Sequence, residues 1–204
     1  MTTKLNTKLD QILPKITSPS FLSSEGIGNE IACYIFDYPA EQELIVRAHI
    51  TFMLKRLDSH HKQIDVLHLN LFDVVIDYLT KRNLLDKVIE MDRKKGAAST
   101  LRGLKGPLSA ERIAKHIVSE HQPGQKDLVL ISGVGSVWPM LRAHGLLNCL
   151  HSSMGTTPLL LFYPGDFDGT GLRLFGKIAS AKGSPDKKPY YRAFKLNSGV
   201  HHED

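Results

Sequence analysis

The stretch Leu128-Val129-Leu130-Ile131-Ser132-Gly133-Val134-Gly135-Ser136-Val137-Trp138-Pro139 decides the fold class of this 204-residue chain. Its apolar run does not alternate with polar residues, which is typical of a strand covered on both faces. Gly133 and Gly135 allow a positive φ or a close approach of the backbone to a ligand. We expect Pro139 in the first turn of a helix that continues to Leu150, where its missing N–H costs nothing. The pattern predicts a strand–glycine–helix junction, the usual anion- or nucleotide-binding point of α/β proteins.

Segments on both sides of this stretch indicate further strands and helices. We predict strands at 31–36, 64–71 and 158–163, an edge strand at 190–196, and helices at 4–13, 41–57, 72–79, 83–95 and 110–121. Pro14 should stop the first helix, residues 97–106 should be weakly structured, and residues 164–171 should form a loop. This order predicts one layered α/β domain over 1–196, with a mainly parallel sheet flanked by helices and a flexible tail at 197–204.

The composition is that of a globular protein, with 42% hydrophobic and 23% charged residues. The net charge of +5 permits contact with nucleic acid without requiring it, because the basic residues are mostly dispersed. Cys33 and Cys149 both have apolar neighbours, which favours two buried thiols in a reducing cytosol. No apolar run approaches the roughly 20 residues of a membrane span, and the N-terminus has no apolar signal core. We therefore expect a soluble cytoplasmic protein that makes no membrane contact.

The glycine turn lacks the residues that phosphate loops use for chemistry. A Walker A loop needs a lysine and a Ser or Thr after its last glycine, whereas Ser136-Val137-Trp138-Pro139 stands here. A dinucleotide fingerprint needs a third glycine where Trp138 lies. NTP hydrolysis is therefore not expected. Two interpretations of this turn remain. It could bind an anion or a nucleotide without catalysis, or it could be a tight turn that supports the core or a partner surface. Arg142 lies close enough in the sequence to contribute to either role.

Asp166-Phe167-Asp168-Gly169-Thr170 matches the Asp-x-Asp-Gly-Thr motif of haloacid-dehalogenase-type phosphatases. In such enzymes the first aspartate is the nucleophile, the second is the general acid, and magnesium neutralises the phosphate. Pro164-Gly165 separates the motif from the predicted strand, and fewer than about 40 residues follow it for the remaining catalytic groups. We favour a β-turn with an Asx cap, with a magnesium phosphatase as the alternative.

Other chemistries have weaker support. The adjacent His60 and His61 point apart, and no cysteine or carboxylate completes a metal site with them. A Ser-His-Asp triad is not indicated, because the chain has no Gly-x-Ser-x-Gly elbow. We expect no metal and no cofactor. The basic stretches 93–95 and 182–188 could make weak contacts with a DNA backbone, but no aromatic residues interleave with them for base stacking.

Several blocks in a fixed order carry a resemblance to a known family. They are Ser18–Leu22, Gly26–Ile31, Tyr34–Tyr38, Leu130–His144, Thr157–Gly169, Leu172–Gly176 and Tyr190–Phe194, and they span about residues 18 to 196. Together they resemble the BrxB family, a component of BREX, a bacterial and archaeal defence system that blocks phage replication and is linked to host DNA methylation. The resemblance brings no catalytic residue set. It implies a role in an assembly with other BREX proteins, above all the alkaline-phosphatase-like protein PglZ, and with the methyltransferase and the large ATPase as further candidates.

The resemblance and the failure of the catalytic templates together predict a non-catalytic adaptor. It would bind partners through the loops at the strand C-termini and an edge strand. A nucleotide- or nucleic-acid-binding subunit of the same system and a magnesium phosphatase remain as alternatives. The residues expected to form the binding surface are Glu30, Asp37, Gly133, Gly135, Trp138, Arg142, Asp166, Asp168 and Arg173.

Overall fold

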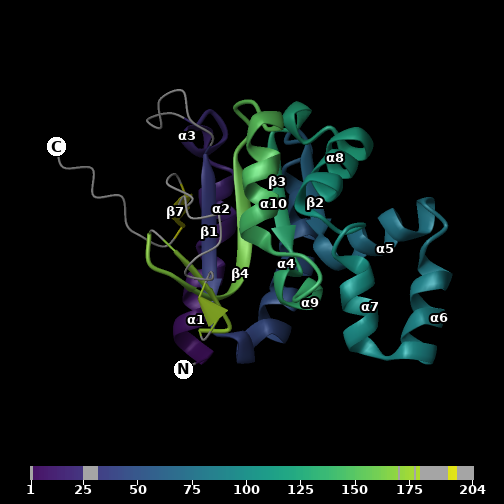
Figure 1. Cartoon of the computed structure of the whole chain (residues 1–204). Helices are drawn as coiled ribbons and strands as arrows, with labels where there is room; N and C mark the ends of the chain where they lie inside the picture. Colours follow the sequence, from purple (N-terminus) through teal and green to yellow (C-terminus); the bar gives the residue numbers. More distant parts are fainter. Residues whose placement is uncertain (1, 25–31, 170, 177, 180–192, 197–204) are drawn as a thin grey trace.

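A parallel β-sheet lies between two layers of helices (Figure 1). The computed structural model describes residues 2–24, 32–169, 171–176, 178–179 and 193–196. In this part of the chain the main sheet has the strand order β2, β3, β4, β1, β7, and all neighbouring strands run parallel. The strands are β1 Cys33–Tyr38, β2 Val66–Asn70, β3 Leu128–Ser132, β4 Leu159–Phe167 and β7 Ala193–Lys195. The predicted α/β class with a mainly parallel sheet is confirmed, and the domain division stays a prediction.

Two apolar cores hold the helices against the two faces of the sheet. Along β3, Leu128 and Leu130 belong to one core and Val129 and Ile131 to the other, because successive strand side chains point to opposite faces. The helices that pack in the first core are α1 Thr2–Asp10, α2 Ile12–Ile16, α3 Pro19–Leu22 and α4 Glu43–His60. The second takes α5 Leu71–Lys81, α7 Ala97–Leu104, α8 Ala110–His121, α9 Val134–Val137 and α10 Ala143–Leu150. Short 3₁₀ turns occupy η1 Ala40–Gln42, η2 Pro123–Gln125 and η3 His151–Ser153.

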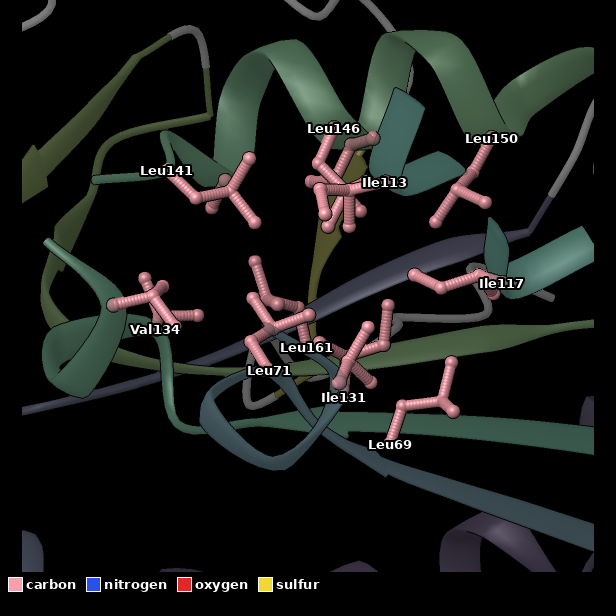
Figure 2. Packing of buried hydrophobic residues seen from close by; sticks show 14 of the residues in the cluster. Leu69, Leu71, Ile113, Ile117, Ile131, Val134, Leu141, Leu146, Leu150 and Leu161 are labelled. Atoms are coloured by element: carbon pink, nitrogen blue, oxygen red, sulfur yellow. The ribbon is translucent and has the colours of Figure 1, made fainter. Parts of the chain in front are cut away.

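The second core is closely packed between strands and helices. Figure 2 shows Ile131 and Leu161 of neighbouring strands across from Ile113 of α8 and Leu146 of α10. Each of these four side chains is at most 1% exposed. Full burial of such a side chain contributes about 1.5–3 kcal/mol, so this layer fixes the helices on the sheet.

Several predicted boundaries differ from the structure. The predicted helix 4–13 is two helices, and α2 passes through Pro14 instead of stopping there. Pro14 is the third residue of α2, where a backbone N–H has no intrahelical partner in any case. The first strand continues through Asp37 and Tyr38. Of the predicted edge strand, 193–195 is confirmed as β7, whereas 190–192 and the tail 197–204 lie outside the described residues.

The expectation of weak structure at 97–106 was wrong, because α7 forms there and packs on α6 Leu85–Lys95. Leu104 is 4% exposed and belongs to the second core. Gly103 permits the approach, since a Cβ at this position would lie 3.1 Å from Met91 Sδ. Packing between the helices outweighs a local sequence that favours helix only weakly.

The prediction of a loop at 164–171 was also wrong for the first half of this segment, because β4 extends to Phe167. Here β4 leaves the parallel sheet and pairs antiparallel with β5 Leu172–Leu174, which in turn pairs with β6 Ile178–Ala179. Asp166 therefore lies within a strand, opposite Arg173. The argument that Pro164 and Gly165 separate the aspartate motif from the strand does not hold.

The junction after β3 combines a left-handed glycine with a very short helix. Gly133 has φ +75° and precedes the four-residue α9. Trp138, with ψ 137°, ends α9, as expected for a residue before proline. Pro139 then lies in a turn, and the next helix begins only at Ala143, so the placement of Pro139 in its first turn was wrong.

Gly133→Ala should lower the free energy of unfolding by about 2–3 kcal/mol. The left-handed φ costs an alanine about 1–2 kcal/mol. The new Cβ would also lie 2.3 Å from Asn70 Oδ1, which caps α5 by accepting a hydrogen bond from Phe72 N at 3.0 Å. Displacing this cap costs about 1 kcal/mol more.

Two glycines provide matched controls in the same denaturant-unfolding experiment. Gly155 has φ +59° but no atom nearer than 4.0 Å to an added Cβ, so Gly155→Ala should show the backbone cost alone. Gly106 has open space and no left-handed φ, so its alanine variant should change stability by no more than about 0.5 kcal/mol. Equal losses at Gly133 and Gly155 would contradict the role assigned to the Asn70 contact.

Candidate functional site

The candidate site lies at the carboxyl edge of the parallel strands, where α/β sheets usually bind ligands. Contacts between neighbouring segments bring most of the predicted residues together there. Asp37 contacts the end of β4, Gly135 and Trp138 contact Phe175 after β5, and Arg173 contacts Asp168. Arg142 is exposed just before α10, and Glu30 lies outside the described residues.

Protein side chains fill the space beside both glycines of the turn. Gly133 is buried, and an added Cβ would collide with Asn70. An added Cβ at Gly135 would lie 3.1 Å from the Phe175 ring and 3.3 Å from Pro164 Cγ. The glycines thus allow α9 to pack closely against the β4–β5 hairpin, and the turn is not an open cradle for a phosphate.

This packing presents a pair of aromatic rings at the surface. Trp138 and Phe175 meet edge to face, with ring centroids 6.1 Å apart. Trp138 remains 38% exposed. An exposed indole fixed by a packed neighbour can anchor another protein, since tryptophan provides a large contact area at little cost in conformational entropy.

Of the aspartate motif, Asp166 and Phe167 belong to β4, and only Asp168 caps the connection to β5. Asp168 Oδ1 accepts a hydrogen bond from Gly171 N at 2.8 Å, and Asp168 N donates to Gly171 O at 3.3 Å. Asp168 Oδ2 accepts from Arg173 Nη2 at 3.0 Å. Both oxygens of this carboxylate therefore have partners within the hairpin, which is poor geometry for a general acid that must reach a substrate.

Asp37 joins three strands through a single carboxylate. Its side chain is 7% exposed, and Oδ2 accepts hydrogen bonds from Lys195 Nζ of β7 at 2.5 Å and from Phe167 N of β4 at 3.1 Å. Oδ1 is buried and has no hydrogen-bond partner among the described residues. Asp37 was predicted to belong to the binding surface, and its observed hydrogen bonds lie within the sheet edge. Sequence reasoning missed Lys195, because nothing local links positions 37 and 195.

A serine–histidine contact between β2 and β3 was also missed. His68 Nε2 lies 2.9 Å from Ser132 Oγ, because the parallel register places the ends of the two strands side by side. Burial lowers the pKa of His68, and the nearby Asp73 carboxylate opposes this shift. Ser132 is 7% exposed and lies within the strand, so this contact has the burial of a structural pair rather than the exposed serine of a nucleophile elbow.

A network of charged side chains joins two helices and includes His116. His116 Nε2 lies 2.8 Å from Asp77 Oδ2, and Lys81 bridges Asp77 and Glu120, which ties α5 to α8. Hydrogen bonds with both carboxylates raise the pKa of Lys81. In the described part of the chain, no three His, Cys, Asp or Glu residues gather around a possible metal position.

A surface groove lies away from these residues, between α8 and α10. Its walls include Ala114, Val118 and Cys149, with Glu111 and Lys115 at its polar side. None of the eight predicted binding residues that the structure describes lines this groove. No described helix is long and apolar enough to cross a membrane.

Comparison with known proteins gives a consistent result. The family model described as "BREX protein BrxB" matches residues 67–196. A protein of Bacillus cereus (strain H3081.97) named "BREX protein BrxB" is 38% identical over 197 residues, covering 95% of this chain and 97% of the relative. A protein of the same name from Escherichia coli O9:H4 (strain HS) is 38% identical over 192 residues, covering 94% and 91%. No solved structure matches the chain.

Lys195→Met should lower the free energy of unfolding by about 2–3 kcal/mol, because it leaves the buried Asp37 carboxylate without its cation. The loss should stay below the 3–5 kcal/mol typical of fully buried pairs, since the Lys195 side chain is 35% exposed. Adding Asp37→Asn to the Lys195→Met variant should recover part of the lost free energy of unfolding. Lys94→Met, which breaks the exposed pair with Glu90, is the control and should cost no more than about 0.5 kcal/mol. Equal losses for the two lysine variants in urea unfolding would contradict this role.

His68 should make the stability depend on pH on the acid side of neutrality. Its folded pKa lies below the usual 6.5, so the unfolded chain binds more protons between these two values. The free energy of unfolding should therefore fall as the pH drops below 6.5. His68→Gln should reduce this slope in urea titrations at several pH values.

His49 contributes in the same direction, because burial lowers its pKa as well, against the opposing charge of Asp10. His49→Gln should therefore remove a separate share of the slope, and the double variant should remove both shares. An unchanged slope in His68→Gln would show that this histidine is not held neutral in the folded protein.

Proposed function

The chain belongs to the BrxB family of BREX proteins, and we propose that it is a non-catalytic adaptor in a cytoplasmic anti-phage assembly. Its main partner would be the PglZ-like component, bound at the carboxyl edge of the sheet. The observation that carries this proposal is the Trp138–Phe175 pair, which stands exposed on a packed junction.

The groups around this pair have the character of a protein-binding surface. Arg142 and Asp166 are exposed, and the Asp168–Arg173 ion pair lies on the same hairpin as Phe175. An aromatic centre with charged residues around it is the usual anatomy of a specific interface. Tryptophan and arginine are also the residues that most often dominate binding energy.

The edge strand β7 extends this surface. Within the described residues, β7 pairs only with β1, so its other side presents unpaired backbone groups. Phe194 on β7 is 45% exposed and contacts Tyr34, with ring centroids 6.0 Å apart. A partner strand could pair with β7 while a pocket takes Phe194.

The local chemistry supports the absence of catalysis at this edge. The turn at Gly133–Gly135 is filled by side chains, and the Asp168 carboxylate is engaged within its hairpin. The Ser132–His68 contact is buried within the sheet. A phosphatase would need an accessible aspartate pair and a magnesium site, and an adaptor needs neither.

Tagged protein expressed with its complete defence locus should co-purify the PglZ-like component. Trp138→Ala should weaken retention more than about tenfold, as expected for an interface hot spot. Arg142→Glu should weaken it as well, and this exposed side chain can be changed without disturbing the core. Phe52→Ala is the matched control, because Phe52 is an aromatic residue 53% exposed on α4, against the opposite face of the sheet.

Quantitative pull-down and thermal melting should be measured for all variants. Wild-type protein that retains no locus-encoded partner would refute the adaptor role. Retention that is equal in Trp138→Ala, Arg142→Glu and Phe52→Ala would leave the adaptor role standing and refute the proposed surface.

A further inference from the structure

The helices α6 and α7 form a hairpin that stands apart from the body of the protein. Figure 1 shows them beyond α5 and β2, on the far side of the sheet from β7. α6 has no buried residue, and α7 reaches the core through Thr100 and Leu104. α6 contacts α7 and, less extensively, α5, and its half-buried Leu85 and Val88 pack against the edge of the second core. An element of this size that contributes little to the core needs another reason to be helical and ordered.

The hairpin region also carries the whole net charge of the protein. Residues 81–105 contain eight of the 26 Lys and Arg residues and three of the 21 Asp and Glu residues. The remainder of the chain has 18 residues of each sign and is formally neutral. The remainder is neutral only as a sum, because residues 173–195 hold seven Lys and Arg residues against one Asp, and an acidic excess elsewhere offsets them.

Five of the eight cations form no ion pair with another described residue. Lys81 and Lys94 form ion pairs, and Arg82 lies over the Tyr78 ring with 4.8 Å between the guanidinium carbon and the ring centroid. The other five are exposed, and the ion pairs within the described residues include none of them. We call these five the hairpin cations: Lys87, Arg93, Lys95, Arg102 and Lys105.

We propose that the hairpin cations bind the phosphate backbone of double-stranded DNA without reading its sequence. Like charges clustered on a protruding element repel one another, and this repulsion is relieved when the charges neutralise phosphates and release counterions. α6 has 11 residues and is therefore about 16 Å long, which is enough to follow several phosphates along a duplex.

The composition of the hairpin favours a duplex over the other anionic partners. Residues 81–105 contain no aromatic side chain, so they offer no platform on which unpaired bases could stack. An acidic protein would normally dock around an apolar centre. Ile89, which is 42% exposed, is the one large apolar side chain of the described hairpin that is strongly exposed. A charged surface without an apolar centre therefore fits a phosphate backbone better than it fits an acidic protein.

Salt dependence tests the proposal with the full chain and a short fluorescent duplex. If all five hairpin cations contact phosphates, log Kd should change with log[salt] with a slope of about 4.5, so affinity should fall about 500-fold between 50 and 200 mM salt. For the variant Lys87→Gln/Arg93→Gln/Lys95→Gln, the slope should be smaller by about 2.7. Its affinity for the duplex should fall only about 12-fold over the same range of salt concentration.

A charge-matched control separates this patch from general attraction. Lys55→Gln/Lys62→Gln/Lys115→Gln removes the same charge from exposed positions outside the hairpin and should keep the wild-type slope. Equal slopes in the two triple variants, or no binding by the wild type, would overturn the proposal. Stronger binding to single-stranded DNA than to the duplex would also overturn it.

Two further measurements keep this result distinct from the adaptor proposal. Polyglutamate that competes as well as DNA, at equal charge and with the same dependence on the hairpin cations, would assign the patch to an acidic protein and refute DNA binding. The hairpin variant should retain the PglZ-like protein in the pull-down, and Trp138→Ala should retain DNA binding. Loss of both activities in either variant would show that the two surfaces are not separate.

Discussion

Burial of the parallel strands on both faces is the constraint on which the rest of this structure depends. All five residues of β3 are buried, so helices must cover both sides of the sheet. One face receives α8 and α10 from successive crossovers, whereas the other receives only α4 between β1 and β2. The N-terminal helices α1, α2 and α3 lie on the same face as α4 and pack with it in the first core, so they complete this layer.

The same packing decides the character of the carboxyl edge. A phosphate site at a strand–glycine–helix junction needs accessible backbone N–H groups. Here Asn70 of β2 occupies the space beside Gly133, and Phe175 and Pro164 occupy the space beside Gly135. The glycines serve close contact between protein segments instead of contact with a ligand. The junction thus keeps the strand–glycine–helix order of a nucleotide-binding turn but exposes the Trp138 indole beside it.

Sequence patterns predicted what depends on local periodicity and missed what depends on pairing across the chain. The strands β2 and β3 and the helices α4, α5, α6 and α8 follow from runs and repeats of apolar residues, and their class was correct. The extension of β4 through Asp166 depends on β5, and α7 depends on its contact with α6, so neither has a local signal. The Asp37–Lys195 and His68–Ser132 contacts join residues 158 and 64 positions apart, and only the register of the sheet reveals them.

Separation of apolar and charged surfaces gives the molecule two faces that do not compete. The edge strand β7 and the hairpin of α6 and α7 lie toward opposite ends of the sheet, and four strand spacings of about 4.8 Å place β7 about 19 Å from β2. A formally neutral body binds a protein through shape and aromatic contacts without strong repulsion or attraction by net charge. The proposed adaptor role and the proposed DNA contact use different ends of the sheet, so binding at one surface would leave the other accessible.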